Sequence, residues 1–85
     1  MGKWARLYKR LSSGASPPRL SFREFEALIV AAGFELKRRR GSHRSYRHPA
    51  MAEVLTVQPN GKDAQPYQIR LFLDMMRRHG LSVED

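Results

Sequence analysis

The chain has 85 residues, which is the length of one small domain. Its 16 lysines and arginines outnumber its 8 acidic residues, and a formal net charge of +8 favours an anionic partner such as a nucleic acid or an acidic protein. The lack of cysteine excludes disulfides and thiolate metal sites. The longest apolar run, residues 28–34, is too short to span a bilayer, and no signal-peptide core precedes it. We therefore expect a cytoplasmic protein with no membrane partner.

Residues 1–20 differ in character from the rest of the chain. Trp4, Leu7, Tyr8 and Leu11 follow helical spacing on one face, and a Ser-, Gly- and Pro-rich stretch comes after them. A helix this short is marginal alone. We interpret residues 1–20 as a basic arm and linker, either loosely docked or bound to RNA or a partner, and residues 21–85 as the folded domain.

A helix is predicted to begin after Ser21, because Ser21 and Glu24 form a capping-box pattern. Gly33 suits the position just past its end. The buried stripe of this helix is expected to be Phe22, Phe25, Leu28, Ile29 and Ala32. The first strand should follow, with Phe34 and Leu36 pointing inward and the basic residues starting at Lys37.

Two further strands are predicted in the middle of the chain. Gly41 and Ser42 form a turn into a strand over residues 43–48, and a turn at Pro49 and Ala50 leads to a third strand over residues 53–58. Alternating apolar and polar positions along these segments are typical of strands with one buried face.

A last helix is predicted to begin at Pro66 and to end at Gly80, with Leu81 folding back on it. Its apolar positions repeat with helical spacing: Ile69, Phe72, Leu73 and Met76. The element order α-β-β-β-α predicts an α+β fold, in which both helices cover one face of a three-stranded antiparallel sheet.

The basic residues concentrate in one stretch. No acidic residue occurs between Leu36 and Ala52, and cations gathered in this way suit a polyphosphate backbone. We therefore expect the predicted hairpin to bind RNA. The residues expected to contact it are Arg39, Arg40, Gly41, Ser42, Arg44, Arg47 and Lys62.

His43 is the candidate catalytic residue. Strand alternation puts His43 and Arg47 on the face opposite Tyr46, whose ring should meet the helices. Neighbouring arginines disfavour a second positive charge, so a neutral imidazole can accept a proton from a ribose 2′-hydroxyl while the arginines stabilise the phosphorane. This predicts a metal-independent endoribonuclease that uses one histidine as general base and acid. A non-catalytic RNA-binding module with the same basic face is the alternative.

Other chemistries fit the sequence less well. The carboxylates are scattered outside the basic stretch, and His43 and His48 should point to opposite faces of their strand. Neither a two-metal site nor a zinc site is expected from such a pattern. Gly41 and Gly61 are explained by turns rather than by a phosphate-binding loop. We expect no metal and no cofactor.

An ordered set of short motifs between Phe22 and Leu81 resembles the HicA toxins of HicAB type II toxin–antitoxin modules. The motifs are Ala32-Gly33-Phe34-Glu35-Leu36, Gly41-Ser42-His43, Tyr46-Arg47-His48-Pro49, Leu55-Thr56-Val57-Gln58 and Gly61-Lys62-Asp63-Ala64-Gln65-Pro66-Tyr67-Gln68-Ile69-Arg70. The Pro-x-His element that many members carry after the third strand is absent, since the chain has Pro59-Asn60-Gly61 there.

The resemblance implies a fold like that of the double-stranded RNA-binding domain. It also implies an mRNA interferase, which acts in stress responses, with His43 as the catalytic residue. The implied partners are mRNA as the substrate and a HicB-type antitoxin that masks the active surface. Operator DNA would be contacted only through the antitoxin.

Overall fold

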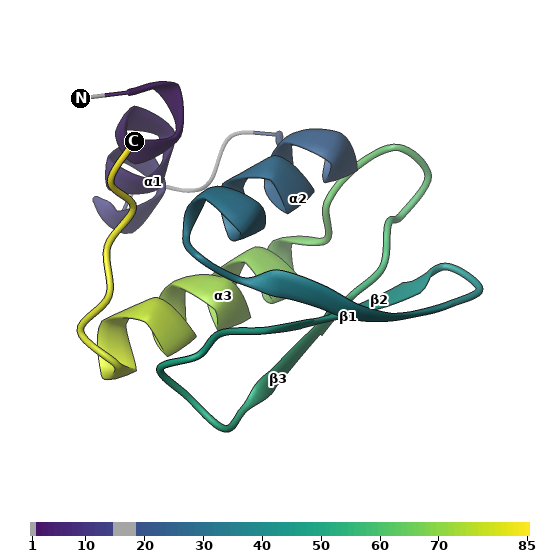
Figure 1. The fold of residues 1–85 in the computed structure, drawn as a ribbon. Helices are drawn as coiled ribbons and strands as arrows, with labels where there is room; N and C mark the ends of the chain where they lie inside the picture. The colour runs from purple at the N-terminus through teal and green to yellow at the C-terminus, as the bar shows by residue number, and fades with distance from the viewer. Residues whose placement is uncertain (1, 15–18) are drawn as a thin grey trace.

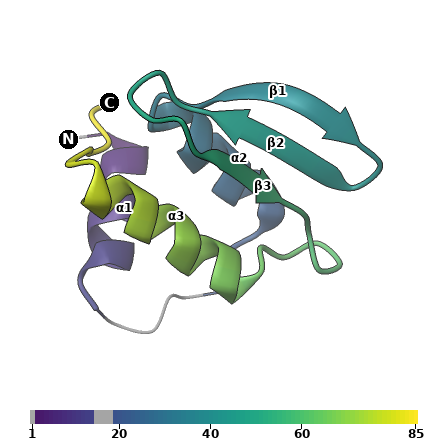
Figure 2. The same ribbon diagram turned by 90° about the horizontal axis from the view of Figure 1, so that it is seen from below.

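The computed structural model describes residues 2–14 and 19–85, so residues 15–18 of the linker predicted over 12–18 lie outside the described residues. The elements in chain order are α1 (Lys3–Ser12), α2 (Phe22–Ala31), β1 (Glu35–Arg40), β2 (His43–Arg47), β3 (Val54–Val57) and α3 (Pro66–Arg78). The strands form an antiparallel sheet in the order β1-β2-β3, and α2 and α3 cover one of its faces (Figures 1 and 2). The predicted α+β fold with the order α-β-β-β-α is confirmed.

The start and end of α2 follow from local chemistry. The Ser21 hydroxyl accepts a hydrogen bond from the Glu24 amide at 3.1 Å, and the Glu24 carboxylate accepts one from the Ser21 amide at 3.4 Å. This reciprocal pair satisfies amides that the first turn of a helix leaves free. Gly33 has a φ of 100°, a conformation that glycine adopts at little cost. The predicted capping box and the terminating glycine are both confirmed.

The core lies between the sheet and the two covering helices. The predicted stripe of α2 is buried throughout, and β3 alternates so that Leu55 and Val57 face the helices. The Phe72 ring of α3 lies edge-on to the ring of Phe25, with centroids 5.9 Å apart. These aromatic and aliphatic contacts join α2, α3 and the sheet into one hydrophobic core.

Leu36 shares the helix-facing side of the sheet with its cross-strand partner Tyr46, as expected, but it is not buried, since 46% of its side chain is exposed. β1 is an edge strand, and its pairing with β2 shifts between Leu36 and Arg38. Tyr46, the cross-strand partner of Leu36, is buried and its ring occupies the space beside α2. Leu36 therefore lies at the rim of the sheet, whereas Phe34 is buried as predicted.

Helix α1 is packed against the rest of the protein rather than loosely docked. Ala5, Leu7 and Leu11 are buried in the same core, and the Tyr8 ring lies edge-on to Phe72 at 6.2 Å. In both ribbon views α2 and α3 lie between α1 and the sheet (Figures 1 and 2). The helical spacing of the N-terminal apolar residues is confirmed, and the apolar face of α1 packs against the core of this same chain.

The C-terminal segment holds the start of α1. The Asp85 carboxylate accepts hydrogen bonds from the amides of Trp4 at 3.0 Å and Ala5 at 2.9 Å, and Val83 is buried. A carboxylate at a helix N-terminus satisfies free amides and interacts favourably with the helix dipole. The segment after α3 therefore runs back along α1 (Figure 1). No helix of the described residues has the length and apolar content needed to cross a membrane.

Candidate nucleic-acid interface

One face of the sheet has no helix on it, and we call it the open face. Its residues follow from the strand pairing, since residues paired across antiparallel strands share a face. Arg40 pairs with His43, Arg38 with Ser45, and Ser45 with Thr56. The members of the open face along the hairpin are Glu35, Arg38, Arg40, His43, Ser45 and Arg47, and Glu35 forms an ion pair with Lys37.

His43 is the first residue of β2, directly after the turn at Gly41 and Ser42. Gly41 has a φ of 58°, which is the left-handed conformation that such a tight turn requires. The His43 side chain is exposed, and it shares its face of the sheet with that of its cross-strand partner Arg40. The hairpin thus presents one imidazole between fixed positive charges.

Of the seven residues expected to contact RNA, only Arg40 and Arg47 lie on the open face beside His43. Arg47 donates a hydrogen bond to the Ala52 carbonyl at 3.3 Å and remains exposed. Gly41 and Ser42 form the exposed tip of the hairpin. Lys62 is exposed in the loop before α3, which both ribbon views place at the same end of the molecule as this tip (Figures 1 and 2).

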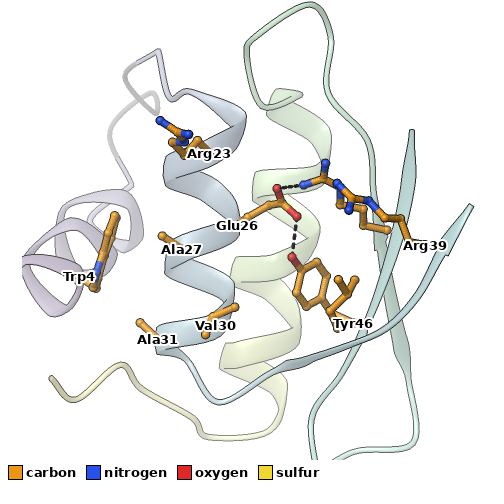
Figure 3. Close-up of a pocket in the computed structure, with 10 residues that line it drawn as sticks. Trp4, Arg23, Glu26, Ala27, Val30, Ala31, Arg39 and Tyr46 are labelled. Carbon is orange, nitrogen blue, oxygen red and sulfur yellow. Dashed lines mark hydrogen bonds and ion pairs between the residues drawn. The ribbon is translucent and has the colours of Figure 1, made fainter. Parts of the chain in front are cut away.

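Arg39 and Arg44 pair with each other on the opposite side of the hairpin, which faces α2. An Arg44 guanidinium nitrogen donates to the Glu26 carboxylate (Figure 3). The guanidinium also lies 5.4 Å from the centroid of the Phe22 ring. The Arg44 side chain is only 27% exposed, and its charge is paired with that of Glu26 inside the protein. The structure therefore does not bring Arg39 and Arg44 together with His43.

Arg38 is an open-face residue that was not among the expected contacts. Its place follows from alternation, because residues two apart on a strand share a face and Arg40 was already assigned. Strand spacing from Arg40 would therefore have identified Arg38. Its pairing with Ser45 shows that the alternation holds in this part of β1, beyond the register shift.

Glu26 neutralises Arg44 on the side of the hairpin that faces α2. Besides the ion pair with Arg44, its carboxylate accepts a hydrogen bond from the Tyr46 hydroxyl at 2.5 Å (Figure 3). Burial, together with this hydrogen bond to an anion, raises the pKa of Tyr46 well above its ordinary value. Tyr46 therefore serves as a buried donor that anchors β2 to α2.

The other two histidines have structural partners. The Ala50 amide donates to Nδ1 of His48 at 3.0 Å, so the ring hydrogen is on Nε2, which lies 3.2 Å from the Ala32 carbonyl. His79 lies 3.1 Å from Glu53, which also binds Arg78. Two hydrogen bonds, of which the one from Arg78 has the larger effect and the one from His79 the smaller, lower the pKa of Glu53 to about 2. Only His43 is an exposed histidine beside unpaired arginines in the described chain.

No cluster of three potential metal ligands occurs in residues 2–14 and 19–85. Along the hairpin, Arg38, Arg40 and Arg47 outnumber Glu35, so the open face is positively charged. Such a face on a small α+β domain suits the backbone of a polyanion.

The protein is thus a small basic α+β domain with a cluster of exposed arginines on the open face of its sheet. The family model described as HicA toxin of bacterial toxin–antitoxin matches residues 22–81 of the 85, and the chain belongs to the HicA toxin family. No curated protein and no solved structure matches the chain. Membership makes it a toxin of a toxin–antitoxin system, a class of protein that pairs with an antitoxin. Helix α1 lies outside the matched range.

Proposed function

We propose that this protein is a metal-independent endoribonuclease that cleaves mRNA, with His43 as its general base and acid. The proposal rests chiefly on one observation, the exposure of His43 on the open face. Its cross-strand partner there is Arg40, and two further arginines, Arg38 and Arg47, lie on the same face. Family membership supports it, because HicA toxins are generally ribonucleases. The cytoplasm, which contains the mRNA, is the proposed site of action.

The chemistry requires one proton acceptor and fixed cations. Neutral His43 takes the proton of a ribose 2′-hydroxyl, and the resulting oxygen attacks the adjacent phosphorus. The new 2′-oxygen–phosphorus bond forms as the bond to the 5′-oxygen breaks, and the protonated imidazole returns its proton to that leaving oxygen. The products are a 2′,3′-cyclic phosphate and a 5′-hydroxyl. Arg38, Arg40 and Arg47 stabilise the negative charge that develops on the phosphorane.

Cleavage of RNA in the presence of EDTA tests this proposal directly. We expect purified protein to cut a long mRNA without added metal and to leave cyclic phosphate ends. RNA binding without any cleavage would instead favour a non-catalytic module that uses the same face for duplex RNA. Neither cleavage nor binding would contradict both functions.

The open-face arginines should account for the salt dependence of RNA binding. We expect the slope of log affinity against log salt to become less steep by about 0.7 for each phosphate of single-stranded RNA that a variant no longer neutralises. Arg40→Gln should show this change. Arg70→Gln is the matched control, because Arg70 is exposed on α3, away from the open face. Equal effects of the two substitutions, measured by fluorescence anisotropy, would mean that the open face does not bind RNA.

The partner proposed for this toxin is a HicB-type antitoxin with an acidic contact surface. Opposite charge speeds association with a strongly basic protein, and binding to the native state raises its stability. An antitoxin that covers the open face would hide His43, so steric exclusion of RNA is sufficient for inhibition. Operator DNA would be bound through the antitoxin.

A further inference from the structure

A groove lies on the other side of the hairpin from the open face. Its floor is the outward surface of α2, with Ala27, Val30 and Ala31, and it has a volume of about 640 Å³. Trp4 of α1 forms one wall (Figure 3), and Leu36 of the β1 edge lines the groove as well. We call this feature the α2 groove.

The α2 groove is lined by apolar side chains that are exposed to solvent. Val30 is 56% exposed, and Leu36 at the edge of the sheet is 46% exposed. Trp4 is only half buried, although Leu7 and Leu11 of the same helix are in the core. Apolar side chains that gather in a concave site, rather than singly on the surface, are typical of a protein-binding surface.

The charges of the groove select the chemistry of its occupant. Arg23 and Arg39 line it, and both are exposed and have no ion-pair partner among residues 2–14 and 19–85. The carboxylate in the groove, Glu26, is already neutralised by Arg44. An occupant with acidic residues toward Arg23 and Arg39 and apolar residues toward Val30 would match both features.

We infer that the α2 groove is the docking site for an acidic segment of the antitoxin that carries apolar anchor residues. This inference rests on the proposed toxin–antitoxin pairing. The floor of the groove is aliphatic and offers no aromatic surface on which bases stack, which favours a peptide over RNA. Because the groove and His43 are on opposite sides of the hairpin, a segment in the groove anchors the antitoxin without itself covering His43. Trp4 lies outside the range that the family shares, so this wall is a feature added by α1.

The test uses the full chain and, as the probe, the purified product of the gene adjacent to it. Val30→Glu places a carboxylate in the apolar floor next to the acidic segment, and we expect the affinity for the probe to fall at least tenfold. RNA cleavage should be unchanged, because Val30 is distant from the open face. Leu71→Glu is the matched control, since Leu71 is another exposed apolar residue on a helix and does not line the groove. It should retain parental affinity.

The outcomes distinguish a failure of the groove assignment from a failure of the proposed toxin–antitoxin pairing. Parental affinity of Val30→Glu, with a folded protein by circular dichroism, overturns the groove assignment and leaves the pairing intact. Lack of binding by the parent chain overturns the pairing and the groove together. Weaker RNA binding by Val30→Glu with unchanged affinity for the probe would make the groove an RNA contact instead. An equal loss in Leu71→Glu would show that added negative charge, rather than the groove, controls binding.

Discussion

Replacement of His43 by alanine is expected to slow RNA cleavage by about 10²–10⁴-fold, the usual loss when a general base is removed. His43 is exposed and makes no side-chain hydrogen bond among the described residues, so the folded structure should persist. RNA affinity should change little, because the open-face arginines remain. Single-turnover cleavage and anisotropy on the same preparation measure the two effects separately. Cleavage above a tenth of the parental rate would exclude His43 as the base.

His48→Ala provides the complementary control. His48 links the β2 end to the α2 end, and its ring lies 5.1 Å from the ring of Phe34. Removal of the imidazole should destabilise the protein by about 1 kcal/mol, because the part-buried Ala32 carbonyl and the exposed Ala50 amide lose their hydrogen bonds to it. The cleavage rate per folded molecule should be close to that of the parent. The two substitutions thus separate the catalytic histidine from a structural one.

A second large effect is expected from Leu11→Ala in α1. Leu11 is 3% exposed, and removal of a buried leucine side chain costs about 2–5 kcal/mol in the free energy of unfolding. Such a cost is a large share of the roughly 5–15 kcal/mol that is typical of whole domains. Urea denaturation followed by circular dichroism measures it. The cause would be an internal cavity between α1 and the helices beneath it.

Leu71→Ala is the control for that measurement, because Leu71 is 41% exposed on α3 and should cost roughly 0.5 kcal/mol or less. If Leu11→Ala were equally mild, α1 would not be part of the stable fold in solution. For the same reason, removal of residues 1–18 is expected to weaken the whole domain rather than release an independent arm. An effect of that truncation on antitoxin binding has to be corrected for stability.

Most of the secondary structure was predictable because its signals are local. The Ser21–Glu24 capping box, Gly33, the turn at Gly41 and the position of Pro66 each act on backbone groups within a few residues. Such chemistry operates in any tertiary setting. The helical spacing of α1 was equally visible. Alternation along β2 also placed His43 and Tyr46 on opposite faces, and the burial of Tyr46 agrees with this.

Partners distant in sequence decided what the amino-acid pattern alone did not. Leu36 faces the helices as expected but stays exposed at the edge of the sheet, and Glu26 binds Arg44, which was expected to contact RNA. Asp85 and Phe72 determine that α1 is docked rather than free. A residue's type and spacing specify the element it belongs to. Its exposure depends on which neighbours the completed fold brings to it, because burial and ion pairing are properties of contacts between elements rather than of one segment.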